Sequence, residues 1–180
     1  MTQKIIYYGL KNEEEEVLKN LGENWEFISP NQEDLHQKVG YIAGLDGYQK
    51  EDLENVTYPE NSQLILFVNP NKEELYHLLQ MAKEEGYIFP HKAIMTETTK
   101  DWQFSYLLGH ILEEHRMVQA YRKLGVLVKQ AQSFLPHEAI EREIQKAKDL
   151  PKLGEDLTTE IVEEVYNNIE GLIETQKSKK

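Results

Sequence analysis

The first hundred residues contain the same hydrophobic–polar unit twice. In each copy an apolar run is followed by a polar turn, an acidic amphipathic segment and a shorter apolar run. The first copy comprises Lys4–Gly9, Asn12–Leu21 and Trp25–Ser29, and the second comprises Leu64–Val68, Asn71–Gly86 and Lys92–Thr96. Strands that alternate with helices of this length predict two β-α-β units in one α/β sheet.

The apolar content of the four runs predicts their order. The runs at 4–9 and 64–68 are almost wholly apolar, which is typical of central strands covered on both faces. The other two are shorter and more mixed, as edge strands tend to be. We therefore predict a four-stranded, mostly parallel sheet in the order 2-1-3-4 with helices on both faces. The alternative is a ferredoxin-like α+β fold in the order 4-1-3-2, with an insertion between strands 2 and 3.

The connection between the second and third strands bears on this choice. It runs from Pro30 to Gln63, whereas a ferredoxin-like fold commonly turns this corner with a short hairpin. Parallel strands need a crossover of a dozen or more residues, so the length favours the parallel sheet. Asn31–Val39 could supply a short helix for such a crossover.

A long helical pattern starts near Asp101 and carries two apolar stripes. The first is Trp102, Phe104, Leu107, Leu108, Ile111 and Leu112, and the second is Met117, Tyr121, Leu124, Leu127, Val128, Ala131 and Leu135. The stripes point in different directions at helical periodicity, so one straight helix cannot bury both against one partner. Either the helix breaks near residue 115 or its second half faces something new. We predict an α/β domain over 1–115 and a helical appendage over 116–180.

Three helices are expected in the appendage, with a disordered tail from about residue 176. The second spans Glu138–Leu150, and Pro151–Asp156 forms a loop. The third, Leu157–Thr175, has the strongest amphipathic pattern, and Thr158 or Thr159 can cap it. Three helices in about 60 residues make a marginal core, so they should pack on the α/β domain or on another chain. We predict a homodimer, or another protein partner, through these helices.

Composition excludes several functions. The net charge is −12, and residues 1–60 alone carry 13 acidic and 5 basic side chains. Nucleic-acid binding is not expected, because a phosphate backbone needs a basic footprint. The basic segment 116–135 suggests membrane-surface docking, which the overall acidity opposes. Without cysteine there are no disulfides and no thiolate chemistry. No run of 18 apolar residues occurs and the first strand starts close to Met1, so we expect a cytoplasmic protein.

Polar side chains follow three of the four strands. They are Asn12 after the first, Asn69 and Asn71 after the third, and Thr96, Thr98 and Lys100 after the fourth. Because parallel strands end at the same edge of a sheet, this edge is the best candidate place for a ligand site, and helix N-termini favour an anion. The interpretation that we favour is that Asn12, Asn71 and Thr98 or Thr99 only cap their helices.

No catalytic set, metal site or cofactor is predicted. A G-x-G-x-x-G sequence and a Walker lysine are both missing. His110 and His115 are five residues apart, off the H-E-x-x-H spacing, and His110 with Glu114 reads as an ordinary surface pair. The resulting hypothesis is a non-catalytic protein-interaction or regulatory module. The alternative is a small-molecule or anion-binding protein, or an enzyme, with its site at the strand ends.

A glycine-rich stretch follows the second strand. It holds Gly40, Gly44 and Gly47 together with Tyr41 and Tyr48. Glycine permits tight turns and close backbone approach, so the stretch is either a ligand-facing loop or a compact corner with core tyrosines.

Two short motifs resemble a family of small bacterial proteins known only as a domain of unknown function. Val39–Leu45 resembles its G-Y-L-A-G pattern, and Lys92–Trp102 with the later Glu114–His115 resembles its K-A-x-x-T-P-T-N-x-x-W…E-H pattern. The resemblance covers about residues 4–117. Glu97 stands where the family has Pro and Thr99 where it has Asn, so any role of that Asn is not carried over. The family implies a fold and a boundary but no activity.

Overall fold

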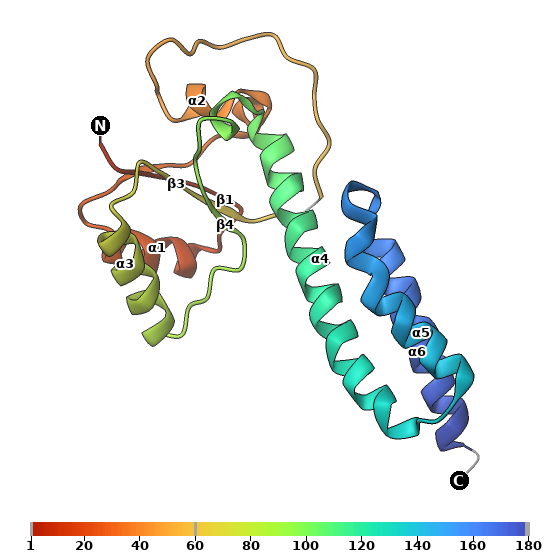
Figure 1. The fold of residues 1–180 in the computed structure, drawn as a ribbon. Coiled ribbons are helices and arrows are strands. Elements are labelled where there is room, and N and C mark those ends of the chain that lie inside the picture. Colours follow the sequence, from red (N-terminus) through yellow and green to blue (C-terminus); the bar gives the residue numbers. More distant parts are fainter. Residues whose placement is uncertain (1, 60, 179–180) are drawn as a thin grey trace. The chain divides into compact units, whose positions relative to one another are not determined.

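The computed structural model describes residues 2–59 and 61–178 of the chain (Figure 1). Two compact units are present. The α/β unit extends to Leu112 and the helical unit begins at Glu113. Helix α4 (Phe104–Ala131) runs through this boundary without a break, so each unit contains one part of it.

A four-stranded sheet forms the centre of the α/β unit. Its strands are β1 (Lys4–Tyr8), β2 (Glu26–Ile28), β3 (Leu64–Val68) and β4 (Lys92–Ile94). Their order is β2-β1-β3-β4, which confirms the predicted order and excludes the ferredoxin-like alternative. The outer pairs are parallel, whereas β1 and β3 are antiparallel. The sheet is therefore mixed. Strands β1 and β2 run in one direction, and β3 and β4 run in the opposite direction.

The two halves are copies of one β-α-β unit, and equivalent residues of the first strand and of the helix start lie sixty positions apart. Helix α1 (Asn12–Leu21) and helix α3 (Lys72–Glu84) occupy equivalent places. Across the antiparallel centre, the Gln3 amide donates to Glu74 (2.6 Å), and the equivalent Gln63 amide donates to Glu14 (3.2 Å). Each glutamine thus ties one half to the helix of the other half.

Both faces of the sheet are covered. Helices α1 and α3 lie on one face (Figure 1), where Leu18 and Leu78 pack on alternate strand residues such as Ile5 and Phe67. The opposite face packs on the segment between β2 and β3 and on the first turns of α4, including Phe104. This segment contains the 3-10 helix Gln32–His36 and helix α2 (Val39–Ile42).

Polar contacts hold this segment together and fasten it to the residue before α4. The buried Gln37 side chain accepts from the Glu51 amide and donates to the Glu51 carbonyl, both at 2.8 Å. Gln103 donates to the Glu54 carbonyl at 2.9 Å. Because buried polar groups cost free energy unless they are hydrogen-bonded, these bonds define the path of the chain here.

The glycine-rich stretch is a compact corner. A Cβ on Gly40 would lie 2.6 Å from the ring of Tyr48, so the chain can only close here with glycine. The Tyr48 hydroxyl donates to Asp101 at 2.6 Å, and this bond raises the pKa of Tyr48. Of the two alternatives, the geometry supports the corner, although Tyr48 is half-buried and does not belong to the core.

The helical unit has its own core. It is built from the second part of α4, α5 (Glu138–Asp149) and α6 (Thr159–Lys177), with short 3-10 turns at Gln132–Phe134 and Leu150–Asp156. Its buried residues include Leu124, Leu127 and Ala131 of α4, Ile140 and Ile144 of α5, and Val162, Val165, Ile169 and Ile173 of α6. The three apolar stripes therefore bury one another.

Several predicted ends and caps are corrected. Thr158 caps α6 by accepting from the Ile161 amide (3.4 Å), whereas Thr159 lies inside the helix and donates to Glu113 (2.6 Å). Helix α6 continues to Lys177, and the Gln176 side chain bonds to His137 (2.8 Å), at the start of the predicted tail. Residues 179–180 of that tail lie outside the described residues.

Candidate functional site

The structure divides the predicted strand-end site between two edges of the sheet. Because β1 and β3 are antiparallel, Asn12 after β1 and Asn69 after β3 lie at opposite edges. The Asn71 amide donates to Gln3, which precedes β1, at 2.6 Å. The prediction assumed that all strands end at one edge, and the direction of β1 relative to β3 makes that assumption wrong.

The remaining residues follow β3 and β4, and the amides of Asn71, Thr96 and Lys100 are already hydrogen-bonded. The Asn71 side chain caps α3 by accepting from the amides of Glu73 (2.9 Å) and Glu74 (3.2 Å). Thr96 and Thr99 bond reciprocally, each hydroxyl accepting from the other residue's amide at 3.1 and 2.8 Å. Local capping therefore uses the N–H groups that an anion would need.

Two further residues of the predicted site were given different roles by the structure. The Lys100 ammonium pairs with Glu97 at 2.6 Å, and this bond raises the pKa of Lys100.

The capping alternative fails for Asn12, because Lys11 occupies the cap position of α1 and Glu14 accepts from its amide (2.8 Å). An anion site at Asn69, Thr96 and Thr98 stays a prediction.

The histidine of the predicted surface pair belongs to an aromatic cluster. The ring of His110 stacks on Tyr106 at 6.2 Å and meets Trp102 edge-on at 5.3 Å. Tyr106 and His110 are four residues apart on α4, a spacing that could have revealed this pair from the sequence, whereas Trp102 precedes the helix. Within 2–59 and 61–178, no group of three or more His, Asp and Glu side chains is arranged to hold a metal ion.

A second surface feature, which we call the α5–α6 groove, runs along the seam between these two helices. It consists of hollows of about 520 and about 320 Å³ that share Asn168 and follow successive turns of both helices. The first is lined by Ala139, Arg142, Glu143, Asn167, Asn168, Gly171, Leu172 and Thr175. The second is lined by Lys146, Asp149, Leu150, Leu153, Ile161, Glu164, Val165 and Asn168.

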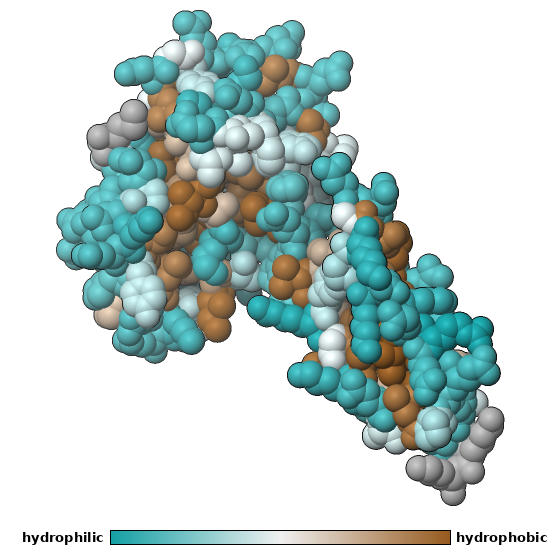
Figure 2. All heavy atoms as spheres, viewed as in Figure 1, coloured by the Kyte–Doolittle hydropathy of each residue, from teal (hydrophilic) through white to brown (hydrophobic). Residues whose placement is uncertain are grey.

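The groove is apolar along its base and charged at its edges. Small residues, Ala139 and Gly171, open the first hollow, and a Cβ on Gly171 would meet nothing within 4 Å. Between the hollows the buried Glu143 accepts from Lys146 (2.6 Å) and from Asn168 (3.4 Å). Hydrophobic atoms are exposed between hydrophilic side chains along the helical unit in Figure 2. Such a surface suits the packing of another helix.

Sequence reasoning did not find this groove. It assigned interaction to the main apolar stripe of the last helix, but Val162 and Ile169 of that stripe are fully buried within the helical unit. The signal that could have found it is the second stripe of small and weakly polar residues, Ala139 on α5 with Asn168 and Gly171 on α6.

Residues 63–118 match the family model described as Domain of unknown function (DUF3783). The prediction of a family known only as a domain of unknown function is thus confirmed for this stretch. It contains β3, α3, β4 and the first turns of α4, while the G-Y-L-A-G-like motif at 39–45 lies outside it. No match was found among curated protein sequences or among solved structures.

The helices were also compared with the requirements of a membrane span. Across the described parts of the chain, none combines the length and the apolar character needed to cross a bilayer.

Proposed function

We propose that this chain is a non-catalytic protein-interaction module that assembles as a homodimer through the α5–α6 groove. The observation that carries the proposal is the pair of adjoining hollows along both helices, the first of them lined by Gly171 and Ala139. Small residues at a helix surface allow another helix to approach closely, and the hollow leaves room for its side chains. A second copy of the same helix pair supplies such a surface.

The arrangement has a definite symmetry. A two-fold axis parallel to the helices would place α5 of one copy opposite α6 of the other. Since α5 and α6 are antiparallel within a chain, all neighbouring helices in the four-helix layer would then be antiparallel, the usual arrangement of up-down bundles. The interface would be isologous and closed, as in most homodimers.

Charges along the groove are complementary in this arrangement. The α5 edge carries Arg142, Lys146 and Asp149, of which Asp149 is paired with Lys152, and the α6 edge carries Glu164. Lys146 and Glu164 lie at the same level of the seam, so Lys146 of each copy would face Glu164 of the other copy. Exposed ion pairs contribute only a few tenths of a kcal/mol each, so they orient the dimer, while apolar residues such as Leu172 and Leu153 stabilise it.

Filling the groove should prevent assembly. In Gly171→Trp the indole would occupy the first hollow, and we expect the dimer to weaken by about tenfold or more, since overpacking a contact costs about 1–3 kcal/mol. The substitution should not unfold the chain, because the Cβ has open space. Sedimentation velocity at micromolar concentration gives the mass.

Gly125→Trp is the matched control. Gly125 is also an exposed helical glycine of the helical unit with open space around a Cβ, but it lies on α4, outside the groove. We expect a dimer mass in the wild type and in the control, and a monomer mass in Gly171→Trp. A monomeric wild type, or a dimer that Gly171→Trp leaves intact, would refute the groove as the interface.

A further inference from the structure

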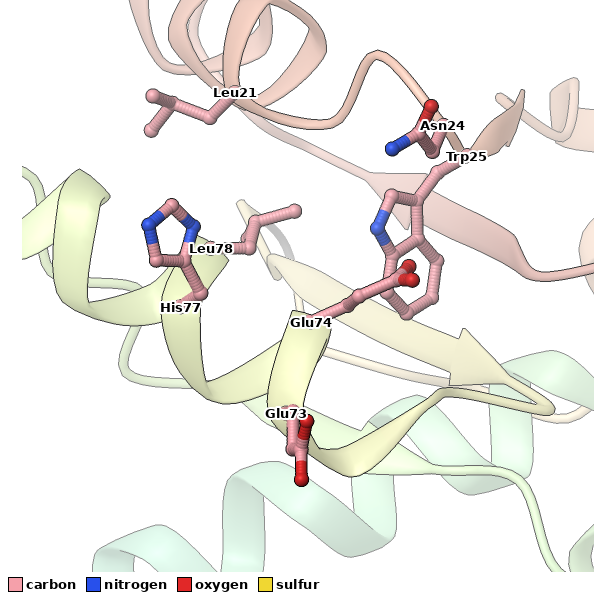
Figure 3. Close-up of a pocket in the computed structure, with 7 residues that line it drawn as sticks. All are labelled: Leu21, Asn24, Trp25, Glu73, Glu74, His77 and Leu78. Carbon is pink, nitrogen blue, oxygen red and sulfur yellow. The ribbon is translucent and has the colours of Figure 1, made fainter.

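A separate cleft lies in the α/β unit, between the end of α1 and the first turns of α3. It has a volume of about 390 Å³. Its base is apolar and largely buried, formed by Leu21, Leu78 and Trp25 (Figure 3). Leu78 is 2% exposed and Trp25 8% exposed, so the base is part of the packed core rather than a loose surface hollow.

Trp25 presents a hydrogen-bond donor to this cleft. Its ring is fixed edge-on against Phe67, with 5.7 Å between centroids. The indole nitrogen faces the cavity in Figure 3, where it is open to the cleft, and no hydrogen bond from it is found to another residue of the described ranges. A nine-tenths buried tryptophan usually finds a partner for its N–H, so the donor points to a ligand that carries an acceptor.

The rim of the cleft is acidic. Glu73 and Glu74 stand in the first turn of α3, where the helix dipole favours negative charge. Glu74 is held in place by the Gln3 amide at 2.6 Å. His77 and Asn24 complete the polar rim. A ligand that enters must therefore combine an apolar stem with a positive charge at the rim.

From this geometry we propose that the α1–α3 cleft binds a lysine or arginine side chain of another polypeptide. The aliphatic stem lies on Leu21 and Leu78, as long basic side chains commonly do on apolar surface. Its cationic head meets Glu73 and Glu74, and a backbone carbonyl next to that side chain accepts from the indole of Trp25. This site is independent of the dimer proposed above, because it uses only the α/β unit.

The internal repeat supplies a matched control for the acidic rim. Glu13 on α1 is the equivalent of Glu73, sixty positions earlier and likewise in the first turn of its helix. It does not line the cleft. Glu73→Gln and Glu13→Gln therefore remove the same charge from equivalent positions, and only the first should affect binding.

The test follows the indole proton of Trp25 by NMR in the full-length protein. Trp102 is the only other tryptophan, and Trp102→Phe assigns the two signals. The probe is N-acetyl-arginine N-methylamide, with the corresponding glutamate derivative as the charge control and agmatine as an alkylguanidine that lacks the carbonyl. We expect the Trp25 signal to shift with a Kd on the order of 1 mM, the value for about 4 kcal/mol of binding free energy.

Glu73→Gln should weaken this binding several-fold, and Glu13→Gln should leave it unchanged. An unchanged Trp25 signal, an equal response to the glutamate derivative, or an equal loss in both variants would overturn the site. Agmatine binding as tightly as the blocked arginine would overturn the assignment to a polypeptide, because the carbonyl would then contribute nothing.

Discussion

Gly9→Ala should lower the free energy of unfolding of the α/β unit by about 3 kcal/mol or more, through strain combined with a backbone clash. Gly9 has φ = 72°, in the left-handed region, and an added Cβ would lie 2.0 Å from the Ser62 carbonyl oxygen. Ser62 cannot easily move, because it is buried and its hydroxyl donates to the Pro59 carbonyl. Chemical denaturation monitored by circular dichroism measures the effect.

Gly125→Ala serves as the control for this substitution. Gly125 lies within α4 with open space around a Cβ, so alanine should stabilise the protein by about 0.5–1 kcal/mol through helix propensity. Substitutions that strain a buried contact typically cost more than about 1 kcal/mol. A Gly9→Ala protein whose free energy of unfolding lies within about 1 kcal/mol of the wild-type value would therefore contradict the tight contact between the end of β1 and the chain before β3.

Ile169→Asp should unfold the helical unit and leave the α/β unit folded. Ile169 is fully buried in the helical core, and an unpaired carboxylate there costs several kcal/mol, more than a unit of about 68 residues is expected to tolerate. The two units have separate cores, so the tryptophans, both in the α/β unit, should still report a cooperative transition. Far-UV circular dichroism should show the lost helix.

Glu170→Gln, the next residue along α6, is the comparison. The Glu170 side chain is only half-buried and accepts from the Tyr166 hydroxyl (2.9 Å), a bond that the glutamine oxygen can keep, so this change should leave the helical unit folded. If Ile169→Asp abolishes both transitions together, the two units fold as one. If it abolishes neither, Ile169 is not in a core.

The periodicity of apolar residues was sufficient to predict most of the elements. The run at 64–68 is β3, the helix predicted at 12–21 is α1, and the amphipathic pattern near the C-terminus is α6. These segments bury their apolar side chains at the period of their own secondary structure, so pattern alone identifies them. The strand order also followed, because the most apolar runs must be central.

Strand direction was not encoded in this pattern. A strand of alternating or continuous apolar residues looks the same in either direction, and the long connection after β2 was expected to be a crossover. It covers a face of the sheet instead, and β3 runs antiparallel to β1. That single difference separated Asn12 from Asn69 and removed the geometry on which the predicted strand-end site depended.

The proposed interaction sites depend on tertiary contacts that no local pattern reveals. Glu73 and Trp25 are distant in sequence, and only the packing of α3 beside the end of α1 brings them to one cleft. Gly171 appears neutral in the helical pattern, because glycine has no side chain to mark a face. Its role becomes visible only when α5 lies beside it with Ala139 at the same level.

The most direct test of the proposed assembly is a mixing experiment with two charge-reversed variants. Lys146→Glu places acidic groups on both edges of the groove, and Glu164→Lys places basic groups on both. In the proposed dimer each variant repels its own copy, whereas a mixed pair regains two attractive contacts. We expect each homodimer to weaken several-fold and the mixture to recover, on the scale of a few tenths to 1 kcal/mol per pair. A mixture whose dimer dissociation constant, measured by sedimentation, returns to the wild-type value would support the dimer. A mixture that dimerises no more tightly than either variant alone would contradict it.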